Sequence, residues 1–136
     1  MRGRSVAAAI AGLAAGAVVV AGCGSEDFPN EPRPPAPVEL SARIDNGGVE
    51  VAPGEIGAGL ATITISNQAD DDVTLNFAGP GDDRETNQIP AGGVSSIKLA
   101  LEQGDYVVEP DVSSISSGNL AVGPERESAQ NELLLP

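Results

Sequence analysis

Several short runs of the sequence alternate apolar and polar residues, and this alternation limits the possible folds more than any other feature. In residues 38–44, the apolar side chains at every second position are Val38, Leu40, Ala42 and Ile44. A period of two is typical of a β-strand with one buried face, because successive side chains point to opposite sides of a sheet. The same alternation recurs in residues 59–66, 73–77 and 96–102, and more briefly in residues 105–109 and 119–123.

Turn-forming sequences rich in Gly, Pro, Asn and Asp separate these runs. They occupy residues 45–48, 52–55, 67–72, 79–83, 90–93 and 102–105. Short strands with turn signals at this spacing are typical of a sandwich of two antiparallel sheets. We therefore predict an all-β domain over residues 38–123, a Greek-key antiparallel β-sandwich, followed by a C-terminal tail over residues 124–136.

The single cysteine, Cys23, stands between an apolar segment and a proline-rich one. Arg2 and Arg4 precede residues 6–20, which contain only Ala, Val, Ile, Leu and Gly. A positive end, an apolar run and small residues before a break are the layout of a secretory signal. The run is short for a helix that spans a bilayer, which needs about 20 apolar residues. We predict a signal peptide over residues 1–22.

The residues directly before the cysteine are Val20, Ala21 and Gly22, and together with Cys23 they resemble the lipobox of bacterial lipoproteins. In that family the thiol receives a diacylglyceryl group, and a peptidase then cuts before the cysteine. The resemblance implies fatty acyl chains such as palmitate on Cys23, and an extracytoplasmic position at the cell membrane. Two acyl chains suffice for stable anchoring. The alternatives are a buried core cysteine and an unpaired extracellular thiol.

The charge balance restricts the partners. The whole chain has a formal net charge of −13, and removal of Arg2 and Arg4 with the signal would make it −15. Such a surface repels nucleic acids and anionic headgroups, so we expect no nucleic-acid partner. Residues 23–37 combine this acidity with five prolines, a composition typical of a semi-rigid linker.

Two segments carry a resemblance to a known fold. Residues 61–77, ATITISNQADDDVTLNF, and residues 89–108, IPAGGVSSIKLALEQGDYVV, resemble paired segments of cupredoxin-like sandwiches. The resemblance covers roughly residues 60–122, and similar motifs occur in other immunoglobulin-like sandwiches. With its lipobox and linker, the chain as a whole resembles small cupredoxin-like lipoproteins of high-GC Gram-positive bacteria.

The copper site of that family does not carry over to this chain. Copper cupredoxins use two His, one Cys and a weak Met. This sequence contains no His, its one Met is Met1, and Cys23 lies upstream of the predicted domain. The loop after Tyr106 has Ser, Asp and Ile where ligands would stand. We expect no cofactor and no mononuclear blue-copper site.

Acidic loops offer a different metal chemistry. Calcium takes six to eight oxygen ligands, and the candidate carboxylates are Asp70, Asp71, Asp72, Asp82, Asp83 and Glu85. They belong to two loops that are expected to flank one hairpin, although their spacing matches no known calcium loop. An accessory role in metal handling is therefore the alternative function, whereas consecutive aspartates that simply face water are the other interpretation.

Catalysis is not expected. The chain has no His to act as a base, and its one thiol is predicted to carry lipid. Carboxylate pairs can hydrolyse glycosides, but the absence of Trp leaves little to form a sugar platform. The sequence therefore favours a non-catalytic binding or structural module, with an unidentified protein as a possible partner.

Two further segments have predicted structural or binding roles. Gly104 and Tyr106 resemble the tyrosine corner of Greek-key sandwiches, in which the phenol bonds to upstream backbone, and a plain core tyrosine is the alternative. The apolar cluster at the end of the chain has three interpretations: folding back onto the domain, a disordered end, or docking into a partner by strand addition. That cluster consists of Leu133, Leu134 and Leu135.

Overall fold

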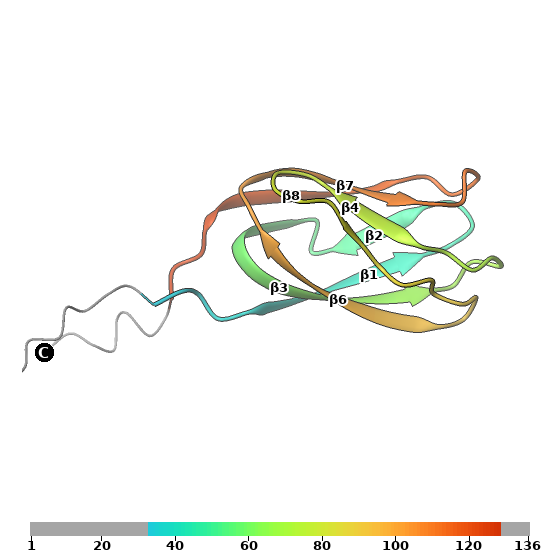
Figure 1. Cartoon of the computed structure of the whole chain (residues 1–136), viewed down its shortest axis with the longest axis horizontal. Coiled ribbons are helices and arrows are strands. Elements are labelled where there is room, and N and C mark those ends of the chain that lie inside the picture. The colour runs from blue at the N-terminus through green and yellow to red at the C-terminus, as the bar shows by residue number, and fades with distance from the viewer. Residues whose placement is uncertain (1–32, 129–136) are drawn as a thin grey trace, which may run out of the picture. The chain divides into compact units, whose positions relative to one another are not determined.

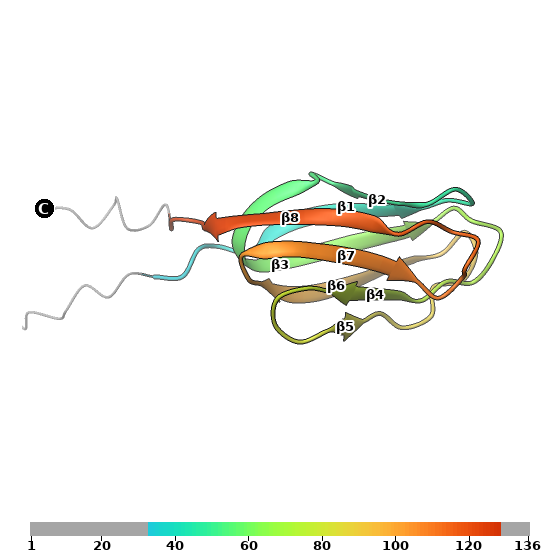
Figure 2. The same cartoon turned by 90° about the horizontal axis from the view of Figure 1, so that it is seen from above.

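Two facing β-sheets make up the computed structural model, which describes residues 33–128 (Figures 1 and 2). No helix occurs among these residues. The strands are β1 (Val38–Ile44), β2 (Val49–Ala52), β3 (Glu55–Asn67), β4 (Leu75–Ala78), β5 (Arg84–Glu85), β6 (Val94–Leu101), β7 (Gly104–Pro110) and β8 (Gly118–Glu125). The prediction of an all-β sandwich is confirmed.

The long strand β3 belongs to both sheets. Its first part pairs with β8, in the sheet ordered β3-β8-β7-β4-β5, and its second part lies between β1 and β6, in the sheet ordered β2-β1-β3-β6. The register shifts between Gly57 and Ala58, and Gly59 has a φ of 133°. Glycine adopts this backbone conformation without steric cost, so the chain can bend there from one sheet to the other.

The alternating side chains form the core between the sheets. Ile44, Ile63, Ile65, Leu75 and Leu120 are fully buried. The buried positions in β1 and in the second half of β3 are those that the alternation predicted. Every strand except the two-residue β5 thus contributes one apolar face, as expected for a sandwich whose outer faces meet solvent.

The strand directions differ in part from the prediction. The pairs β1–β3 and β3–β8 are parallel, whereas the others are antiparallel. For β1 and β3, the reason is that β2 lies on one edge of β1 and runs antiparallel to it, and that the chain then reverses again and pairs with the other edge of β1 as β3. After two reversals, β3 runs in the same direction as β1. The sandwich therefore has mixed sheets rather than purely antiparallel ones.

Arg126 ties both described ends of the chain to the bend in β3. Its guanidinium donates hydrogen bonds to the carbonyl oxygens of Gly57 (3.1 Å), Leu60 (2.8 Å) and Ala36 (3.1 Å). The described chain consequently begins and ends at the same end of the sandwich (Figures 1 and 2). Residues 33–128 contain no helix of the length and apolarity that a membrane crossing requires.

Candidate functional site

Four loops gather at the end of the sandwich opposite the two chain ends (Figure 2). They connect β1 to β2, β3 to β4, β5 to β6, and β7 to β8. We call this region the loop end. Backbone hydrogen bonds join neighbouring loops, for example Val49 N to Ser116 O at 3.0 Å and Val73 N to Ile89 O at 3.0 Å. The loop end therefore brings together residues from four separate loops, as loop-built functional sites do.

Asn67 is the most buried polar side chain at the loop end, with 1% of its surface exposed. Its amide nitrogen donates to the carbonyl oxygens of Asp71 (2.8 Å) and Ile89 (2.9 Å), and its oxygen accepts from Ala69 N (3.0 Å). The side chain joins its own loop to the loop before β6. Because both ends of the amide are occupied, Asn67 has a structural role.

The carboxylates at the loop end accept hydrogen bonds from the protein itself. Asp72 accepts from Ala91 N at 3.0 Å, Asp111 from Thr74 N at 2.8 Å, and Asp70 from the Asn46 amide at 2.9 Å. Each bond joins two loops that lie far apart in the sequence. These aspartates therefore fix the loops in place.

Asp45 closes the turn between β1 and β2. Its carboxylate accepts hydrogen bonds from Gly47 N (2.8 Å) and Gly48 N (3.0 Å). These two bonds, helped by the nearby Arg43 guanidinium, lower the pKa of Asp45 below its usual value. A carboxyl group whose pKa is lowered by folding stabilises the native state above its unfolded pKa, and this contribution is lost as the pH falls through the lowered value.

The structure does not bring the calcium candidates together. Asp70 and Asp72 lie in the loop before β4, and Asp82 and Asp83 lie in the loop after it, at opposite ends of the sandwich (Figure 2). Within residues 33–128, no three or more His, Cys, Asp or Glu side chains are grouped so that they could hold a metal ion.

The loop end does not fit a copper ion either. Where the loops before β4 and after β7 meet, the buried side chains Val73 and Ile115 are apolar. The nearby Asn67 amide is fully hydrogen-bonded, and the sequence has no His to supply imidazole. A mononuclear blue-copper site requires His nitrogen and Cys sulfur ligands, which this donor set lacks.

Tyr106 makes the contact that defines a tyrosine corner. Its ring is buried, and its hydroxyl accepts a hydrogen bond from Glu102 N, four residues upstream, at 3.0 Å. The same hydroxyl donates to Pro80 O at 2.7 Å. Gly79 lies against the ring, and a Cβ there would overlap Tyr106. Gly104 has a φ of 144°, and a Cβ there would overlap Pro80.

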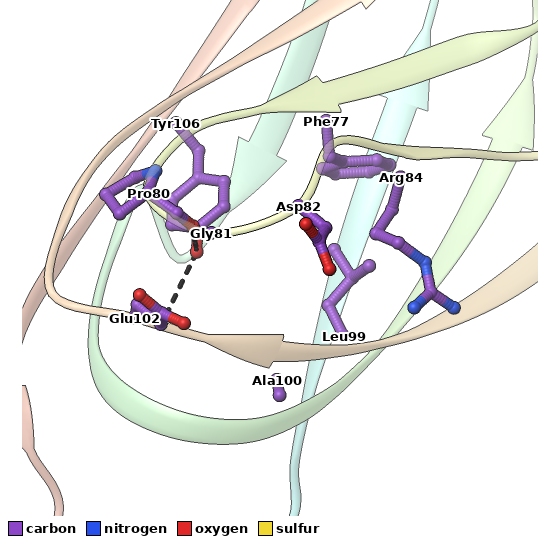
Figure 3. Close-up of a pocket in the computed structure, with 9 residues that line it drawn as sticks. All are labelled: Phe77, Pro80, Gly81, Asp82, Arg84, Leu99, Ala100, Glu102 and Tyr106. Atoms are coloured by element: carbon purple, nitrogen blue, oxygen red, sulfur yellow. Dashed lines mark hydrogen bonds between the residues drawn. The ribbon is translucent and has the colours of Figure 1, made fainter.

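A shallow hollow of about 150 Å³ lies beside this corner (Figure 3). Phe77 and Leu99 form its apolar floor, and Asp82 lies between them in this view. Glu102 and Arg84 flank it on opposite sides. The hollow also contacts Pro80, Gly81, Ala100 and Tyr106. Its rim carries charge of both signs, which suits recognition of a charged side chain.

The remaining predicted site residues lie outside the described part of the chain. These are the lipobox residues with Cys23, and the leucines Leu133, Leu134 and Leu135. Sequence reasoning missed three residues that the structure brings into prominence: Asn67, Arg84 and Arg126. The sequence showed Asn67 only as the first residue of a turn-forming segment, residues 67–72. The roles of Arg84 and Arg126 depend on long-range contacts that no local pattern reveals.

Comparison with known proteins supports the fold. No protein-family model matches the sequence, and a search of curated proteins gives no match. Among solved structures, the chain is similar to auracyanin B, with 15% identity, a TM-score of 0.53, and coverage of 68% of this chain and 92% of that one.

It is also similar to auracyanin A, a "blue" copper protein from the green thermophilic photosynthetic bacterium Chloroflexus aurantiacus. The identity is 14%, the TM-score is 0.50, and the match covers 65% of this chain and 100% of that one. At such low identity the likeness concerns the fold alone. The predicted cupredoxin-like fold is confirmed.

Proposed function

We propose that this chain is a non-catalytic binding module with a cupredoxin-like fold, held by lipid on Cys23 at the extracytoplasmic face of the cell membrane. The observation that carries the binding role is the chemistry of the loop end. Asn67, Asp72 and Asp111 direct their polar atoms to the protein's own backbone. Because the described residues contain no cluster of three or more metal-binding side chains, we take the surface of the sandwich to be what the domain offers to a partner.

The path of the chain supports the anchoring. The described chain begins at residue 33, within the predicted linker, and Arg126 holds Ala36 against the bend in β3. A tether that enters at this end would leave the loop end and the outer faces of both sheets free. The lipobox residues Val20, Ala21 and Gly22, directly before Cys23, supply the sequence argument for the lipid.

Metal titration tests the binding-module proposal against the alternative of metal handling. We expect no saturable heat of binding and no change in melting temperature when the full chain is titrated with copper or with calcium. The physical reason is that the loop end lacks the His and Cys ligands of a blue-copper site, while the loops that carry Asp72 and Asp82, before and after β4, lie at opposite ends of the sandwich. Isothermal calorimetry and thermal unfolding provide the two readouts.

Saturable binding of either metal at one site, with a rise in melting temperature, would contradict the proposal. A matched control is the titration of magnesium, which detects weak screening of a highly acidic surface. Equal heats for calcium and magnesium that disappear at high salt concentration would reflect this screening of surface charge, and they would uphold the proposal.

A further inference from the structure

Strand β6 is the one long open edge among the strands of residues 33–128. It pairs along its whole length with β3 and with no other described strand. The other edges are better protected: β2 is short and donates from Val49 N to Ser116 O, and β5 contains two residues. The N–H and C=O groups on the free side of an edge strand are a template for another strand.

The edge of β6 lacks most of the devices that block strand addition. It has no proline and no register shift over its eight pairs with β3. Lys98 is its only charged residue. Val94, at its start, has 68% of its surface exposed, which is the largest value among the exposed large hydrophobic residues of the described chain. Among the described residues, the outer side of β6 therefore has no paired strand along its whole length.

The hollow beside Tyr106 adjoins this edge. Leu99, Ala100 and Glu102, from β6 and the turn after it, form one side, and Phe77 and Asp82 form the other. A strand laid along β6 would run past the hollow, and side chains on one face of that strand would point toward it. The edge would supply main-chain bonds, and the hollow would select a side chain.

We propose that an extended basic segment of a partner protein adds to β6 as a strand and places one Lys or Arg side chain in the hollow. The aliphatic stem would pack on Phe77 and Leu99, and the cation would reach the carboxylates of Asp82 and Glu102. Arg84, also on the rim, carries the opposite charge to Asp82 and Glu102. The proposal rests on the role as a binding module and is independent of the lipid.

Charge favours a basic partner over a second copy of this chain. The chain has a formal net charge of −13, so two copies repel each other. Asp82, Asp83, Glu85 and Glu102 lie in the segments around the hollow. In a dimer, these carboxylates would lie near the acidic surface of the second copy and repel it. A basic strand would instead neutralise some of their charge.

The test uses the full chain and a synthetic probe peptide of alternating Lys and Val. Two control peptides have a central Pro, which cannot donate a strand hydrogen bond, or Glu in place of Lys. We expect the Lys-Val peptide to bind in a fluorescence anisotropy titration and to slow amide hydrogen exchange across β6. Neither control peptide should do so.

The variant Asp82→Asn with Glu102→Gln is expected to weaken peptide binding about tenfold, because it removes two exposed ion pairs that each strengthen binding about threefold. The matched control is Glu39→Gln with Glu55→Gln, which changes the net charge equally but away from the hollow. It should leave the affinity within about twofold. Thermal unfolding confirms that both variants are folded.

Equal binding of the Pro-containing peptide, or equal loss in both double variants, would overturn the proposal in favour of general charge attraction. Slow amide hydrogen exchange of β6 in the absence of peptide, in a chain that sediments as a dimer, would overturn the proposal and indicate that a second copy of this chain pairs with β6. These outcomes are distinct from a failure of the proposed function, which saturable copper or calcium binding would reveal.

Discussion

Replacing Asn67 with Asp is expected to lower the free energy of unfolding by about 4 kcal/mol at neutral pH. The carboxylate cannot donate the two hydrogen bonds that the amide gives to Asp71 O and Ile89 O. It would instead place a buried negative charge against two carbonyl oxygens. Since a domain of this size is stable by about 5–15 kcal/mol, such a loss approaches complete unfolding.

The measurement is urea unfolding of the full chain, and the control is Gln68→Glu. That substitution makes the same chemical change at the next residue, whose side chain is exposed, so we expect a change within about 0.5 kcal/mol. Burial raises the pKa of the new carboxyl group at position 67. The loss of unfolding free energy caused by Asn67→Asp should therefore become smaller as the pH falls and the new carboxyl group is protonated. Equal stability of the two variants would contradict the role given to Asn67.

Replacing Gly79 with Ala is expected to destabilise the domain by about 3 kcal/mol, because the added methyl group would overlap the ring of Tyr106. The ring cannot move away without breaking its hydroxyl bonds to Glu102 N and Pro80 O. Tyr106→Phe, which removes the hydroxyl and keeps the ring, should destabilise by about 2 kcal/mol. Thermal or urea unfolding measures both effects.

Gly54→Ala is the matched control for this turn glycine. A Cβ at Gly54 would make only an ordinary contact, 3.7 Å from Val51 O. We expect no destabilisation and as much as about 1 kcal/mol of stabilisation, from the reduced freedom of the unfolded chain. A loss at Gly54 as large as that at Gly79 would mean that the tyrosine corner is not what constrains Gly79.

The sequence predicted the fold class because alternation records which face of each strand is buried. The apolar positions of β1 and β3, such as Leu40 and Ile63, follow directly from it. The strand β2 and the two-residue β5 are too short to show a period. The sequence did not reveal that β3 crosses between the sheets. The alternation continues past Gly59, so nothing in it marks the bend there.

The site was less predictable because its contacts join distant parts of the chain. The Gly-x-Tyr spacing of Gly104 and Tyr106 indicated a local bond to upstream backbone, which is a short-range feature. Asp82, by contrast, lies beside Leu99 only because β4 and β6 belong to facing sheets. Whether acidic loops meet or diverge likewise depends on topology, and here β4 separates them.

The intact mass of the protein, extracted from the membrane of its native host, tests most directly whether lipid holds the domain. We expect a chain that begins at Cys23 and carries additional mass equal to a diacylglyceryl group, and we expect Cys23→Ser to abolish that mass. An unmodified thiol at Cys23, or a chain that retains residues 1–22 without lipid, would contradict it.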